Sequence, residues 1–280
     1  MAINWYPGHM AKTRREITEC IDMVDAVIEI RDARIASSSA NPIIDQLCEG
    51  KPRLILLNKA DLSEERVTNM WIQSLSNEFT KVTVGNSLTG KGLNNIKPLL
   101  NELLKEKLDA YRKKGLVKYT IRVMVVGIPN VGKSSFINRV GNNTRAKVGD
   151  KPGVTKTKQW IKTKLDIDLM DTPGVLWPKF EDESVGLNLA FTGAIKDEIM
   201  DIETLALKLI EVLQTYYPER LKERYKLDEL SEDPLVNMEN MALKRGAILP
   251  GKNIDYTRIA VMVLDEFRGG KLGKISLERP

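Results

Sequence analysis

The chain has 280 residues, of which 42% are hydrophobic and 29% charged, enough apolar material for one large or two medium globular domains. Its 43 Lys and Arg against 38 Asp and Glu give a net charge of +5, which favours an acidic partner. The two cysteines, Cys20 and Cys48, exclude a disulfide framework and lack the spacing of zinc ligands. Because neither a secretory leader pattern nor an apolar run of about 18 residues is found, we expect a cytoplasmic protein that does not span a membrane.

Short apolar runs of β type alternate with helical patterns through the first two thirds of the chain. The runs predict strands at residues 25–30, 53–57, 81–84, 123–126 and 165–170. Apolar residues at three- and four-residue spacing predict one amphipathic helix over 93–113. The alternation is typical of βαβ units, so we predict an α/β fold with a doubly wound, mostly parallel sheet.

Beyond Pro178 the β-type runs stop, and the apolar periodicity becomes helical. Helices are predicted at residues 201–217, 234–245 and 255–267. We therefore predict two domains, an α/β domain of residues 1–178 and an all-helical domain of residues 179–280.

A G-x-x-x-x-G-K-S sequence follows the strand predicted at 123–126 and opens a helical pattern, which is the context that a P-loop requires. Backbone N–H groups of a P-loop bind phosphates, Lys133 would reach their β and γ oxygens, and Ser134 would ligate Mg²⁺. The loop residues expected to contact nucleotide are Asn130, Val131, Gly132, Lys133, Ser134 and Ser135. A chance match in a glycine-containing turn is the alternative. The sequence therefore predicts a P-loop NTPase.

Two further sequences would complete the phosphate and Mg²⁺ site. D-T-P-G follows the last predicted strand, so Asp171 would hold Mg²⁺ and the Gly174 N–H would face the γ-phosphate. Between this sequence and the P-loop, P-G-V-T supplies Thr155, whose hydroxyl would complete the Mg²⁺ shell. D-x-x-G alone is a common turn, and the preceding P-loop is what gives it this meaning.

Base specificity is predicted at the end of the run 53–57, in an N-K-x-D sequence made of Asn58, Lys59, Ala60 and Asp61. The Asp61 carboxylate would accept hydrogen bonds from N1–H and N2–H₂ of guanine, donors that adenine lacks. Asn58 and the Lys59 stem would flank the base. A turn with an Asx cap is the alternative for this tetrapeptide. We therefore predict GTP and GDP, with Mg²⁺, as the ligands.

The order of these motifs is unusual, because the base-binding residues precede the P-loop. Asn86 and Ser87, a weaker candidate for supporting the base through N–H groups, also precede it. The sequence therefore resembles the circularly permuted GTPases. Chain ends of compact domains tend to lie close together at the surface, so a permuted chain preserves the sheet.

The N-W-Y-P-G-H-M start, the D-A-R segment at 32–34 and the motifs above together resemble the ribosome biogenesis GTPase A family of bacteria. The resemblance implies late maturation of the 50S subunit, GTP hydrolysis stimulated by the ribosomal particle, and a helical domain that contacts ribosomal RNA. We expect the GTP form to dock on the 50S precursor and to leave after hydrolysis.

The catalytic group is not evident next to D-T-P-G, because the apolar Val175 and Leu176 cannot orient a water. The resemblance assigns this role to His9, for which a helix cap is the alternative. It also suggests that Asn130 supports a K⁺ ion that neutralises transition-state charge, with a loop-stabilising role as the alternative. The expected catalytic residues are His9, Lys133 and Asn130.

The positive charge is concentrated, with 16 Lys and Arg against three Asp and Glu in residues 105–164. Solvated helix faces normally intersperse acids, so a stretch of one sign favours contact with RNA phosphates. Residues 181–280 are acidic in total, and their RNA contact is implied by the resemblance alone. The expected partners are the 50S precursor and its 23S rRNA, bound by a monomer.

The sequence leaves two other hypotheses open. In one, the chain is an rRNA-binding assembly factor in which the nucleotide is mainly structural. In the other, a GTPase acts with a modification enzyme or at a membrane, which no lipidation motif or amphipathic anchor in the sequence supports.

Overall fold

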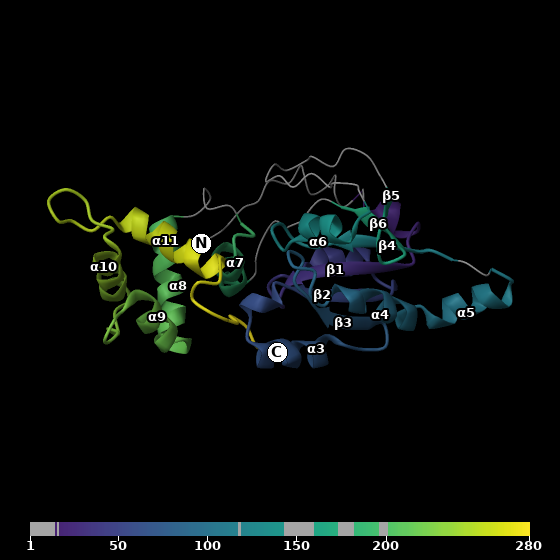
Figure 1. Ribbon diagram of the computed structural model, residues 1–280, viewed down its shortest axis with the longest axis horizontal. Helices are drawn as coiled ribbons and strands as arrows, with labels where there is room; N and C mark the ends of the chain where they lie inside the picture. Colours follow the sequence, from purple (N-terminus) through teal and green to yellow (C-terminus); the bar gives the residue numbers. More distant parts are fainter. Residues whose placement is uncertain (1–14, 16, 117–118, 143–159, 173–181, 196–200) are drawn as a thin grey trace. The chain divides into compact units, whose positions relative to one another are not determined.

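The computed structural model describes residue 15 and residues 17–116, 119–142, 160–172, 182–195 and 201–280 (Figure 1). The chain divides into two compact units. The α/β unit comprises residues 2–180 together with the last residues, 276–280, and the helical unit comprises residues 181–275.

The α/β unit is built on a six-stranded sheet in the order β3-β2-β1-β4-β6-β5. The strands are β1 (Ala26–Asp32), β2 (Arg53–Asn58), β3 (Thr80–Val84), β4 (Ile121–Val126), β5 (Trp160–Lys162) and β6 (Ile167–Asp171). At one edge β5 pairs antiparallel with β6, and the other described pairs are parallel. This sheet confirms the predicted α/β fold. The short β5 was not predicted, because a three-residue strand leaves no apolar run in the sequence.

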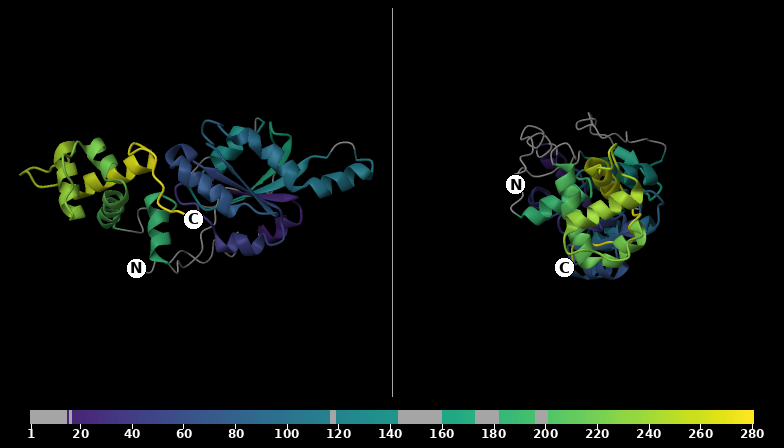
Figure 2. Two further views of the ribbon diagram at one scale, coloured as in Figure 1. Left: turned by 90° about the horizontal axis from the view of Figure 1, so that it is seen from below. Right: turned by 90° about the vertical axis from the view of Figure 1, so that its left-hand side faces the viewer.

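Helices cover both faces of the sheet (Figure 2, left view). They are α2 (Pro42–Leu47), α3 (Glu65–Leu75), α4 (Ile96–Leu103), α5 (Lys105–Lys113) and α6 (Lys133–Val140), with 3₁₀ turns η1 (Ala60–Leu62) and η2 (Leu93–Asn95). Every residue of β1 is buried, including Glu29, Arg31 and Asp32, which is typical of a central strand in a doubly wound sheet.

The single helix predicted over 93–113 is wrong, because the segment consists of η2, α4 and α5. At Leu104 the backbone (φ −104°, ψ 15°) leaves the helical region and ends α4. The apolar side chains of α4 pack on β2 and β3, with Ile96 and Leu100 buried, whereas α5 has no buried residue. Packing therefore holds α4 on the sheet but does not require α5 to continue its axis.

The helical unit consists of helices packed around α8. Its helices are α7 (Glu183–Phe191), α8 (Ile202–Tyr216), α9 (Pro218–Tyr225), α10 (Pro234–Arg245) and α11 (Tyr256–Arg268). The helices predicted at 201–217, 234–245 and 255–267 are α8, α10 and α11, and each begins after an aspartate that caps it: Asp201, Asp233 and Asp255. Within the described ranges, no helix has the length and apolarity that crossing a bilayer requires.

Candidate nucleotide-binding site

The predicted P-loop lies between the buried strand β4 and helix α6. Gly127 (φ 149°) and Gly132 (φ 101°) adopt conformations that favour glycine. A Cβ on Gly127 would lie 2.6 Å from the Ile30 carbonyl oxygen, and one on Gly132 would lie 2.3 Å from Asn58 Nδ2. Both glycines are therefore required for the loop to approach its neighbours this closely.

Lys133 is the first residue of α6, and its ammonium lies inside the loop. Its Nζ donates hydrogen bonds to the carbonyl oxygens of Gly127 (3.0 Å) and Ile128 (2.7 Å). Burial lowers the pKa of Lys133 to about 8, against the opposing effect of the Asp171 carboxylate. A bound phosphate would supply the negative charge that this buried ammonium favours.

Asp171 ends β6 opposite Val125 of β4, next to the P-loop. The Thr172 hydroxyl fixes this strand end by donating to the Val125 carbonyl oxygen at 2.7 Å. Burial raises the pKa of Asp171, and Lys133 and the Thr172 N–H only partly offset it. Mg²⁺ prefers oxygen ligands, so this carboxylate and the half-buried Ser134 hydroxyl fit the ion by donor type.

Asn58 joins the base-recognition sequence to the P-loop, although Val131 lies 73 positions further along the chain. Its buried Nδ2 donates to the Val131 carbonyl oxygen at 2.7 Å, and its Oδ1 accepts from the N–H and the hydroxyl of Ser87, each at 2.9 Å. These contacts therefore join the three loops that the motifs predict to form the nucleotide site.

In the residues that follow Asn58, the Lys59 side chain is held by an ion pair, whereas Asp61 is exposed. Lys59 has a left-handed backbone (φ 56°), and its Nζ lies 3.0 Å from Asp32 Oδ2. The Ala60 N–H donates to the Gly85 carbonyl oxygen at 3.3 Å. Asp61 lies exposed in η1, where its carboxylate is open to a ligand.

Asp32 is a residue of this site that the motifs do not assign. The strand predicted at 25–30 ends before it, and only the parallel pairing of β1 with β2 in the structure places Asp32 opposite Asn58.

The polar groups of Asn86 and Ser87 form hydrogen bonds with other loop residues. Asn86 Oδ1 accepts from the N–H groups of Leu88 (2.8 Å) and Thr89 (2.9 Å), while the Ser87 N–H is donated to Asn58. Asn130 lies in the P-loop with a left-handed backbone (φ 59°). The remaining predicted site residues, His9, Thr155 and Gly174, lie outside the described residues.

Comparison with known proteins identifies the family. Ribosome biogenesis GTPase A of Bacillus cereus is 47% identical over 280 residues, which span 100% of this chain and 95% of that protein. The chain belongs to the ribosome biogenesis GTPase A family. A family model described as a 50S ribosome-binding GTPase matches residues 122–240. Mitochondrial ribosome-associated GTPase 1 of Bos taurus is 33% identical over 300 residues, covering 98% of this chain and 88% of that protein.

A solved structure of GNP-bound YlqF from T. maritima, at 26% identity, has a TM-score of 0.67 and covers 96% of this chain and 98% of its own. These findings confirm the resemblance to the ribosome biogenesis GTPase A family, and the chain is a GTP hydrolase that binds guanine nucleotide.

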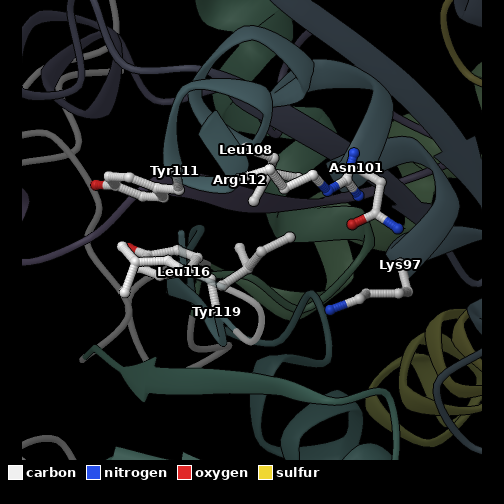
Figure 3. A pocket seen from close by; sticks show the side chains of 8 residues that line it. Lys97, Asn101, Leu108, Tyr111, Arg112, Leu116 and Tyr119 are labelled. Atoms are coloured by element: carbon white, nitrogen blue, oxygen red, sulfur yellow. The ribbon is translucent and has the colours of Figure 1, made fainter. Parts of the chain in front are cut away.

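A pocket of about 190 Å³ is lined by residues that belong to none of the nucleotide motifs (Figure 3). Its lining combines basic, amide, aromatic and apolar side chains: Lys97, Asn101, Leu108, Tyr111, Arg112, Leu116, Tyr119 and Ile121. The rings of Tyr111 and Tyr119 lie 4.6 Å apart between centroids. Lys97 Nζ donates to the Asp166 carbonyl oxygen at 2.8 Å.

Proposed function

We propose that this GTPase binds the maturing 50S subunit through 23S rRNA, drives a late assembly step with GTP, and is released after hydrolysis. It would act as a monomer in the cytoplasm, where bacterial ribosomes assemble. The observation that carries the proposal is the Asn58 link between the P-loop and N-K-x-D, in a chain whose full length matches ribosome biogenesis GTPases.

We propose the following roles at the nucleotide. Ser134, Thr155 and Asp171 hold Mg²⁺, Gly174 faces the γ-phosphate, and Asp61 binds the guanine edge. Asn130 supports a K⁺ ion near the phosphates. Equal hydrolysis rates in KCl and NaCl at the same ionic strength would exclude this role of K⁺.

The RNA-binding surface is proposed to include α5 and the turn that follows it. The basic side chains there are exposed: Lys105, Lys107, Arg112, Lys113 and Lys114. The nearby pocket adds aromatic rings, and aromatic rings beside cations suit an unpaired RNA base with its phosphate.

Purified 50S subunits are expected to stimulate GTP turnover, and the stimulation is expected to fall as salt concentration rises. Each phosphate contact contributes about 0.7 to 0.9 to the slope of log affinity against log salt. The double variant Lys113→Glu, Lys114→Glu should reduce this slope, whereas Arg66→Glu, an exposed charge change on α3, should not. Turnover that is identical with and without 50S subunits at low salt would contradict the proposed function.

His9→Ala is expected to keep GTP affinity and to lower stimulated turnover sharply, because the imidazole would position the attacking water. The measurement is single-turnover hydrolysis with saturating 50S particles, beside GTP affinity in their absence. A variant that hydrolyses at the wild-type rate removes His9 from the mechanism.

A further inference from the structure

The last residues of the chain pack on the α/β unit, although they follow the helical unit in sequence. The Leu277 N–H donates to the Arg34 carbonyl oxygen at 2.9 Å. The Glu278 carboxylate accepts from the N–H groups of Ser37 (2.8 Å) and Ser38 (3.0 Å) and from the Ser38 hydroxyl. The Glu278 carboxylate therefore holds the loop that follows β1 in place.

Ser276 makes a second attachment on the far side of the base-recognition sequence. Its buried Oγ accepts from the Glu64 N–H at 3.1 Å. Glu64 precedes α3, and its own side chain does not cap that helix. Residues 276–278 thus contact the chain both before and after the segment Asn58 to Asp61, and we call them the C-terminal clamp.

The loop held by the clamp is built around a buried ion pair. Arg34 donates from Nε to Asp32 Oδ1 (2.9 Å) and from a terminal nitrogen to Oδ2 (2.8 Å), with both side chains almost fully buried. Burial would raise the pKa of Asp32, but Arg34 and Lys59 hold it well below its usual range. A buried pair of this kind depends on good geometry, so movement of the loop would disturb Asp32.

Asp32 also binds Lys59, through the 3.0 Å contact between Oδ2 and Nζ. We propose that the C-terminal clamp fixes the Asp32–Arg34 pair, that Asp32 fixes the Lys59 ammonium, and that Lys59 is thereby positioned for the face of the guanine base. Asp32 and Glu278 are positioning residues, since they act through Lys59. The inference rests on the proposed role of Lys59 in base binding.

The physical basis is preorganisation. If the loop after β1 is released, Lys59 samples other orientations, and nucleotide binding must select the competent one from this mixture. Apparent affinity falls in proportion to the fraction of molecules that remain competent. The clamp would therefore couple the C-terminal residues to guanine nucleotide affinity.

The test is GDP affinity of the full-length chain, measured by fluorescence with a labelled GDP. Glu278→Ala is expected to weaken binding by about tenfold, as for a competent fraction of about one tenth. Arg279→Ala is the matched control, because this neighbouring side chain makes an exposed 3.4 Å ion pair with Glu64, and the variant is expected to bind GDP as the wild type does. Wild-type affinity in Glu278→Ala would overturn the proposal.

A double-mutant cycle with Lys59→Met distinguishes an effect of Glu278 through Lys59 from a general effect of Glu278 on the fold. Methionine keeps most of the lysine stem and removes the ammonium. Glu278→Ala should cause no further loss in that background, and an equal loss in both backgrounds would reject the path through Lys59. Lys59→Met that binds GDP normally would instead reject the role of Lys59 itself. Should Glu278→Ala fail to fold, Glu278→Gln is the milder variant, because its NH₂ group replaces one of the two oxygens that accept from Ser37 and Ser38. A smaller loss of GDP affinity is then expected, and an equal loss in both backgrounds again rejects the path through Lys59.

Discussion

Replacing Lys133 by methionine is expected to lower GTP turnover by about 100-fold or more, as loss of a preorganised charge at the transition state does. The Lys133 ammonium is held inside the P-loop by two carbonyl oxygens, at 3.0 and 2.7 Å, where β and γ phosphates would bind. Methionine keeps an apolar stem of similar length, so the packing of α6 is preserved. Arg139→Met is the control, because Arg139 is exposed in the last turn of the same helix and its replacement should leave turnover unchanged.

The pH dependence of GDP affinity provides a second readout of the same ammonium. Burial lowers the pKa of Lys133 to about 8, and a bound phosphate raises it again by favouring the charged form. Below pH 8 the lysine is charged with or without nucleotide, so affinity does not change through this group. Above pH 8 binding must take up a proton, so affinity falls as pH rises. Lys133→Met should remove this fall, and a variant that retains it would exclude Lys133 as the cause.

A variant that binds GTP but does not hydrolyse it separates the two hypotheses about why the chain binds nucleotide, and His9→Ala is the variant expected to keep GTP affinity. If hydrolysis drives assembly or release, His9→Ala should leave immature large subunits in cells that contain no other copy. Normal subunit assembly with a variant that binds but does not hydrolyse GTP would show that the nucleotide is mainly structural.

The nucleotide motifs could be predicted because their physical requirements are local. A tight phosphate loop needs glycine where φ is positive, as at Gly132, and a buried parallel strand such as β4 gives a continuous apolar run. The helix break at Leu104 could not be predicted, because the apolar spacing continues through it and only tertiary packing distinguishes α4 from α5.

The hydrogen bonds that hold the predicted site residues in place could not be predicted from the sequence either. Glu278 binds Ser37 across 241 positions of sequence, and polar residues in a terminal segment carry no pattern that reveals such a partner. Asn58 was assigned to the base from its motif, whereas its amide also bonds to the P-loop and to Ser87. Motifs thus predict which residues serve the nucleotide, whereas only the long-range pairing in the structure shows what holds them.

Asp61→Asn is expected to weaken GDP binding by about 100-fold or more, because hydrogen bonds to a charged acceptor contribute about 1.5–3 kcal/mol each. The exposed Asp61 carboxylate in η1 can accept from both N1–H and N2–H₂ of guanine. Asparagine offers one carbonyl oxygen and an NH₂ group, which would face the guanine amino group as donor against donor. The measurement is the Kd for GDP at constant pH and salt.

Binding of a xanthine nucleotide tests whether Asp61→Asn changes the base preference as expected. Xanthine carries a carbonyl oxygen where guanine carries the amino group, so the asparagine NH₂ would gain an acceptor. Asp61→Asn is therefore expected to bind xanthosine diphosphate more tightly than GDP, reversing the wild-type preference. Glu65→Gln removes the same charge from an exposed position just beyond η1 and should leave the preference unchanged. If Asp61→Asn retained the preference for GDP, the base edge would have to be recognised by a residue other than Asp61.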